Sequence, residues 1–92
     1  MKTPDSPIAE LIIKIGKLTE WNNHTGAVCA LAQFAGSEIE IAESAQIEKL
    51  HGEIGHMPWP LMMRRNTLRD RIMGKIAASH GWTSAIAIWD SF

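Results

Sequence analysis

The sequence predicts an all-α fold, a compact bundle of four or five short helices. Two observations carry this prediction: apolar residues recur at helical spacing in three segments, and residues that favour helix ends flank these segments. The composition agrees with a globular chain, since 46 % of the residues are hydrophobic and 21 % are charged. With 92 residues, the chain is expected to form one domain, residues 1–92.

The first predicted helix begins at residue 7, directly after its N-cap. Ser6 suits an N-cap, and Pro7 suits the first helical position, where a missing N–H costs nothing. The apolar stripe of this helix consists of Ile8, Leu11, Ile12, Ile15 and Leu18. Residues 21–23 are expected to form the exit turn, because asparagine favours turns, and Trp21 is expected to join the core.

The second and third predicted helices lie on either side of Gly36, which suits a helix end. Residues 27–35 are apolar except for Gln33, and a short helix that is apolar all round is a central, buried one. Residues 37–40 read Ser-Glu-Ile-Glu, a capping box for the next helix. That helix continues through Ile47, Leu50, Ile54 and Met57. The alternation of polar and apolar residues near 38–42 also permits a short strand.

Two prolines interrupt the helical pattern at residues 57–60, because each lacks a backbone donor and biases its predecessor away from helix. Pro60 is expected to open a long helix that ends near residues 80–81, although Thr67 could start a shorter one. The apolar residues of the long helix are Leu61, Leu68, Ile72 and Ile76. We expect a last helix near 82–89, with a short strand near 84–89 as the alternative. Trp82, Ala85, Ile86 and Trp89 fit one face of that helix.

The charges are distributed unevenly along the chain. Residues 1–60 contain four lysines and eight acidic residues, whereas all four arginines fall within residues 64–71. Folding the chain back at residues 58 and 59 predicts ion pairs between an acidic and a basic helix. The expected pairs are Glu53 with Arg64, Glu48 with Arg69, and Glu43 with Lys75. Such pairs specify which helices pack together, although each contributes only about 0.2–1 kcal/mol when exposed.

A free basic cluster would instead bind nucleic-acid phosphates. The residues for this alternative are Arg64, Arg65, Arg69, Arg71 and Lys75. The isoelectric point near 6.4 favours the ion-paired interpretation over this one.

No pattern in the chain indicates catalysis, and no cofactor is expected. Cys29 lies between apolar neighbours, far from any charged residue, which is typical of an inert core thiol. Two Glu-x-x-His pairs, Glu48 with His51 and Glu53 with His56, have the spacing of metal ligands in helical bundles. They lie five residues apart on one helix, which rotates them by about 140°. We therefore expect surface residues and no metal site, with a dimeric metal-binding protein as a further alternative.

The expected partner-binding surface lies at residues 57–65, where two prolines make the chain rigid. Its members are Met57, Trp59, Met62, Met63, Arg64 and Arg65. Tryptophan and methionine are enriched at the centres of protein interfaces, and the arginines would form a polar rim. Trp59 could equally complete the core.

The resulting hypothesis is a small non-catalytic module that binds another protein as an adaptor, regulator or inhibitor, of the kind that phage or plasmid accessory genes encode. A homodimer is compatible with this hypothesis, and nucleic acid is the less expected partner. No apolar run is long enough to span a membrane, and residues 1–7 lack the apolar core of a secretory signal. We therefore expect the cytoplasm.

Overall fold

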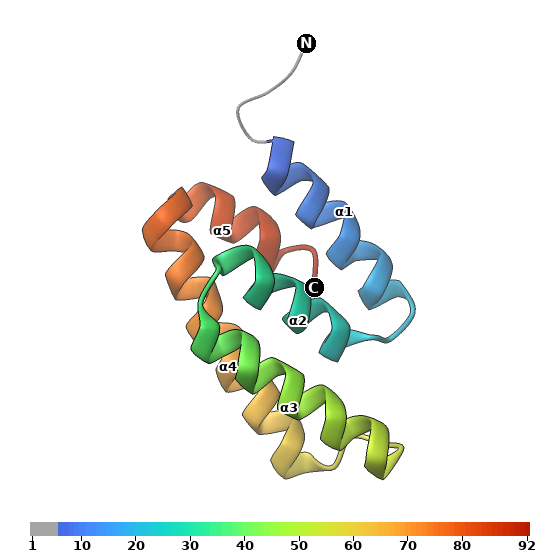
Figure 1. Cartoon of the computed structure of the whole chain (residues 1–92). Coiled ribbons are helices and arrows are strands. Elements are labelled where there is room, and N and C mark those ends of the chain that lie inside the picture. The colour runs from blue at the N-terminus through green and yellow to red at the C-terminus, as the bar shows by residue number, and fades with distance from the viewer. Residues whose placement is uncertain (1–5) are drawn as a thin grey trace.

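The computed structural model describes residues 6–92, and these residues form five helices and no strand (Figure 1). The helices are α1 (Ser6–Glu20), α2 (His24–Ala35), α3 (Glu38–Ile54), α4 (Trp59–His80) and α5 (Trp82–Trp89). The prediction of an all-α bundle is therefore confirmed. Across the described residues, every helix is too short or too polar to span a lipid bilayer.

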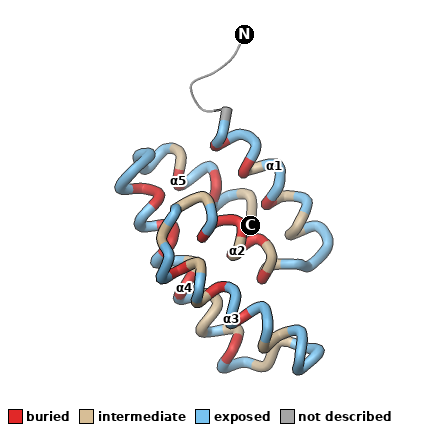
Figure 2. The backbone as a smooth tube through the Cα atoms, in the orientation of Figure 1, coloured by how far each residue is buried: buried red, intermediate tan, exposed pale blue. Residues whose placement is uncertain are grey.

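Helix α2 is the centre of the bundle and packs against α1, α3 and α4 (Figure 1). Its buried residues are Thr25, Ala27, Val28, Ala30, Leu31 and Ala32, as the apolar composition predicts (Figure 2). The small alanine side chains let the neighbouring helices approach closely. Asn23 caps the helix by accepting a hydrogen bond from the backbone N–H of Gly26 at 3.0 Å. Gly36 ends it in the left-handed conformation, with φ of 70°.

The remaining core comes from one face of each surrounding helix (Figure 2). Fully buried side chains include Ile15 of α1, Ile47 of α3, Leu68, Ile72 and Ile76 of α4, and Ile88 of α5. Within α4 these residues recur at intervals of four, which is the spacing of one helical face.

Two details of the predicted helix starts differ in the structure. Ser37 does not cap a backbone N–H of α3, so the predicted capping box is absent there; its hydroxyl instead donates a hydrogen bond to the Glu40 carboxylate. Helix α4 begins at Trp59, one residue before Pro60, and runs unbroken through Thr67. The predicted capping by the Ser6 side chain lies outside the described part of the structure.

Residues 38–42 and 84–89 are helical, so neither of the alternative strands forms. Helix α5 turns Ala85 and Ile88 inward, and this leaves Trp82 and Ile86 on its outer side. Of the four residues predicted to share one face of this helix, only Ala85 is buried.

The prediction that Trp21 joins the core is wrong. Its side chain is 81 % exposed, because α1 ends at Glu20 and the chain turns away from the core there. Asn22, with φ of 57°, continues this turn in the left-handed conformation that asparagine tolerates.

We predict that Leu31→Ala lowers the free energy of unfolding by about 2–5 kcal/mol, because Leu31 is fully buried in the central helix and its truncation leaves a cavity. Urea unfolding followed by circular dichroism measures this loss. Ile39→Ala is the matched control, since Ile39 is largely exposed on α3, and it should change the stability by less than about 0.5 kcal/mol. Equal losses in the two variants would contradict the placement of the core.

Candidate functional site

A buried carboxylate joins the start of α3 to the middle of α4. Glu40 is only 3 % exposed, and its oxygens lie 2.8 Å from Nζ of Lys75 and 3.0 Å from Nε of Arg71. It also accepts a hydrogen bond from Ser37. The Lys75 ammonium, the Ser37 hydroxyl and Arg71 hold the pKa of Glu40 at about 2, well below its usual value. The first turn of α3 further favours a negative charge at this position.

Glu43 extends this contact one helical turn further along α3. Its carboxylate lies 2.6 Å from Nη2 of Arg71 and 4.0 Å from Nε of Arg64. The hydrogen bond from Arg71 to Glu43 raises the pKa of the Arg71 guanidinium. Arg64 also donates a hydrogen bond to Gln46. The acidic and basic helices therefore do pack together through ion pairs.

The predicted partners in these pairs were wrong, however. Glu48 contacts the thiol of Cys29 and not Arg69, and Glu53 makes no ion pair among the described residues. The reason is helical rotation, because residues five apart point about 140° away from one another. Positions 64, 71 and 75 share the side of α4 that faces α3, whereas Arg69 lies on another side.

Arg69 turns toward the C-terminal helix. Its guanidinium carbon lies 4.4 Å from the ring centroid of Trp89 and 5.5 Å from that of Phe92. Nη2 of Arg69 lies 3.4 Å from Asp70, while its buried Nε makes no hydrogen bond within residues 6–92. This cation–π contact holds the end of α5 on α4.

Arg65 also points inward, with Nη1 3.4 Å from the hydroxyl of Thr25. Burial and then the neighbouring Arg69 lower the pKa of Arg65. The ring of His24 stacks on Phe92 at 6.3 Å, and burial, followed by the charges of Arg65 and Arg69, lowers the pKa of His24. The five residues of the predicted nucleic-acid cluster therefore split between ion pairs with α3 and inward contacts.

Glu48 and His51, the first pair of candidate metal ligands, contact different residues. His51 shares a hydrogen bond of 3.2 Å with Thr25, and Glu48 lies 3.6 Å from the Cys29 sulfur. Burial raises the pKa of the half-buried Cys29 thiol, which disfavours the reactive thiolate. Within residues 6–92, no three histidine, cysteine or acidic side chains are grouped as metal ligands.

The predicted partner surface at residues 57–65 is only partly accessible. Trp59 is 68 % exposed and Met63, one turn further along α4, is also exposed. Met57 and Met62 are half-buried, and Met57 packs against the core. Since Arg65 points inward and Arg64 pairs with α3, the accessible part of this surface consists mainly of Trp59 and Met63.

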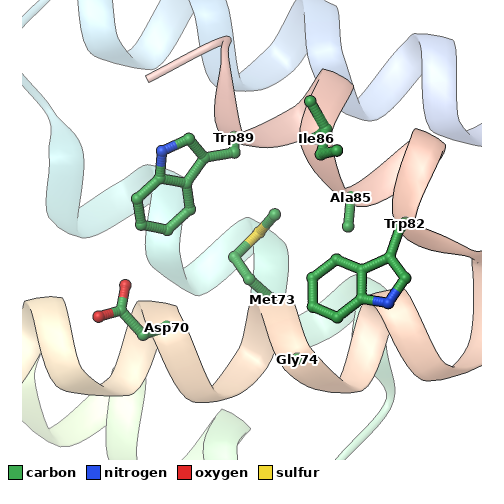
Figure 3. A pocket seen from close by; sticks show the side chains of 7 residues that line it. All are labelled: Asp70, Met73, Gly74, Trp82, Ala85, Ile86 and Trp89. Atoms are coloured by element: carbon green, nitrogen blue, oxygen red, sulfur yellow. The ribbon is translucent and has the colours of Figure 1, made fainter.

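A second apolar surface lies between α4 and α5, and sequence reasoning did not identify it as a site. It is a groove of about 260 Å³, named here the tryptophan groove (Figure 3). Trp82 and Trp89 stand on either side of Met73, with Gly74 on the α4 side and Asp70 at the Trp89 end (Figure 3). Ala85 and Ile86 complete the lining. Trp82 is 72 % exposed, so an aromatic side chain large enough to anchor a core stands in solvent.

One signal in the sequence could have indicated this groove. Trp82, Ile86 and Trp89 repeat at intervals of four and three residues, while Ala85 and Ile88 form a second apolar row on the same eight-residue helix. A helix with two apolar rows can bury one row in the core of its own domain and present the other row to a partner.

The two apolar surfaces are joined along one side of α4, named here the α4 outer face. It consists of Trp59, Met63, Thr67, Asp70, Gly74 and Ala78, which are all exposed. They recur at intervals of three or four residues and therefore line one side of the helix over roughly 29 Å. Asp70 is the one charged residue of this row. The result is a long, nearly uncharged face that continues into the tryptophan groove.

Comparison of the chain with protein families, with curated proteins and with solved structures found no match.

We predict that the protein loses stability as the pH falls from about 5 to about 2. The pKa of Glu40 is about 2 in the folded chain and near 4.5 in an unconstrained chain, so its ion pairs contribute fully above pH 4.5 and are lost as it becomes protonated. Glu40→Gln removes the titrating group and should flatten this part of the profile of urea unfolding against pH.

Glu38→Gln is the control for this measurement. Glu38 is an exposed carboxylate in the same turn of α3 and makes no ion pair within the described residues. We expect Glu38→Gln to keep the pH dependence of the natural sequence. If the Glu40→Gln profile were as steep as that of the natural sequence, the ion pairs of Glu40 would not contribute to acid stability.

Proposed function

We propose that this chain is a small non-catalytic module that binds another protein through the α4 outer face and the tryptophan groove. The single observation that carries the proposal is the exposure of Trp59 and Trp82 on one side of the bundle, with Trp82 lining an apolar groove there. Exposed apolar surface of this kind is costly for a monomer and typical of interaction sites. Tryptophan is also the residue most enriched among those that dominate binding energy.

The rigidity of this surface supports the same proposal. Trp59 stands at the first position of α4, between Pro58 and Pro60, and Arg69 fixes Trp89 by a cation–π contact. Side chains and backbone that are already ordered lose little entropy on association. A partner would meet a surface that needs little rearrangement.

The nucleic-acid alternative receives less support from these contacts. Arg64, Arg71 and Lys75 are already paired with Glu40 and Glu43, and their positive charge is largely neutralised. Arg65 and Arg69 point into the protein. Phosphate binding requires cations that are free to release counterions from the backbone, and paired cations contribute little.

A role as an adaptor, regulator or inhibitor in the cytoplasm fits a module of this size, with an accessory gene as its source. Each of these roles needs a binding surface and no chemistry. The α4–α5 side of the bundle would serve as that surface in all three.

We predict that Trp59→Ala weakens binding to a partner by about 2 kcal/mol or more while the melting temperature stays within a few degrees of the natural sequence, because Trp59 is exposed and its loss leaves the core intact. The partner is first captured from the native cell on the immobilised natural chain, and its affinity for each variant is then measured with purified protein.

Trp21→Ala is the matched control, because Trp21 is even more exposed than Trp59 but follows the C-terminal end of α1. It should bind the partner as the natural sequence does. Equal retention of the partner by Trp59→Ala would place the binding surface elsewhere, and a large loss of melting temperature would assign Trp59 to the core.

A further inference from the structure

We infer that the occupant of the tryptophan groove is Trp59 of a second copy of this chain, in a symmetric dimer of antiparallel α4 helices. This inference rests on the proposed function and names the partner at the same site. It arises because one chain carries both an exposed projecting ring and an unfilled apolar groove, on the same side of the same helix.

The projecting half lies at the start of α4. Trp59 and Met63 are large, exposed and one turn apart. Helix α5 has eight residues and covers roughly 12 Å of α4, which has 22 residues and extends over roughly 33 Å. Since α5 packs near the C-terminal half of α4, it does not cover the half that contains Trp59 (Figure 1).

The receiving half lies roughly 22 Å further along the helix, at Gly74. Gly74 is exposed in the C-terminal half of α4, and a Cβ atom added there would meet no atom of residues 6–92 within 4 Å. Glycine in a helix interior is unfavourable relative to alanine. Among residues 6–92 no contact requires a glycine at position 74, as is also true at positions 16 and 52, but of these three only Gly74 lines the tryptophan groove. A bulky ring that closes on position 74 from outside would account for the glycine, because the missing side chain opens the floor of the tryptophan groove (Figure 3).

A two-fold axis places Trp59 of each copy at the tryptophan groove of the other copy. If α4 of one copy lies antiparallel to α4 of the other, Trp59 comes opposite Gly74 to Ala78 of the second copy, and Met63 comes opposite Asp70 to Gly74. Isologous pairing of this kind buries the same surface on both copies and closes after two. The α5 helix of each copy then covers the part of α4 that the other copy's own α5 leaves bare.

The charged residue of the α4 outer face also meets a polar residue in this arrangement, one that lies beside that face. Asp70, its one charged residue, comes opposite Asn66 of the second copy, a half-buried side chain whose amide can donate to a carboxylate. The shared register thus pairs large residues with small ones and an acceptor with a donor. It does not place any carboxylate directly opposite another.

The exposed tryptophans supply about half of the area that a standard interface takes from each partner. An aromatic side chain buries about 150–250 Å² in total, so the exposed parts of Trp59, Trp82 and Trp89 supply roughly 300–400 Å² of the roughly 800 Å² that a standard interface takes from each partner. Ile86, Met63 and the small residues of α4 add to this.

The test uses Gly74→Ala in the full chain, because the substitution has opposite effects on folding and on association. A methyl group at position 74 favours the helix and should raise the melting temperature of dilute monomer by a few degrees. The same group narrows the groove and should weaken dimerisation by about tenfold at each of the two identical contacts, or about a hundredfold overall. Sedimentation equilibrium over a range of concentrations gives the dimer dissociation constant.

Gly52→Ala is the matched control, since Gly52 is also exposed, helical and free of neighbours within 4 Å, but lies on α3. It should raise the melting temperature without changing the dissociation constant. A second variant, Trp59→Phe, makes the projecting ring smaller. The double variant with Gly74→Ala should dimerise more tightly than the two single variants predict if their losses of affinity are added. The reason is that the smaller ring of phenylalanine leaves room for the methyl group of alanine.

Each alternative outcome overturns the inference. A natural chain that sediments as a monomer at every concentration has no second copy in its groove, and a dissociation constant unaffected by Gly74→Ala places the dimer interface elsewhere. Additive losses in the double variant show that Trp59 and Gly74 do not meet. These outcomes do not contradict the proposed function if a different captured protein still binds the natural chain more tightly than Trp59→Ala. If that protein binds Trp59→Ala as tightly as the natural chain, the proposed function is overturned and the dimer inference is not.

Discussion

The packing of the bundle depends on α2, an apolar helix that is stable only when other helices cover it. This helix has no charged residue, and six of its twelve residues are buried, so it is stable only when α1, α3 and α4 surround it. Each of these three helices packs one face against α2. Among residues 6–92, α5 is then the one helix left to cover the outer side of α4, and it covers only part of that side. The exposed tryptophans are therefore a consequence of how the core is built.

Electrostatics fixes how α3 and α4 lie against each other within this frame. Glu40 is buried, and a buried carboxylate without partners would be strongly unfavourable. Lys75 and Arg71 satisfy it from one side of α4, and Glu43 continues the row to Arg64. The ion pairs thus select one rotation of α4 about its axis. That rotation turns Leu68 and Ile72 into the core and leaves Trp59 and Gly74 outside.

The helices could be predicted from the sequence because their signals are local. The uniformly apolar 27–35 segment, Gly36 and the prolines at 58 and 60 each act on the nearest turn of chain, and the structure agrees with them. The ion pairs could not be predicted in detail, because matching charges along the chain ignores the rotation that separates Arg64 from Arg69. Trp21 and the tryptophan groove were missed for a related reason: an apolar residue near a helix end can face in either direction, and only the packing of α1 and α5 decides which.

Cys29 gives this arrangement an experimental use of its own. It is the one cysteine of the chain, its thiol lies half-buried between α2 and α3, and its S–H is within hydrogen-bonding distance, 3.6 Å, of both the Ser44 carbonyl oxygen and the Glu48 carboxylate. The sulfur is therefore partly accessible to a thiol reagent even when α2 and α3 are packed together. A variant that loosens the packing of α3 on α2 should raise the rate of modification, and this rate is measured without any label added to the natural sequence.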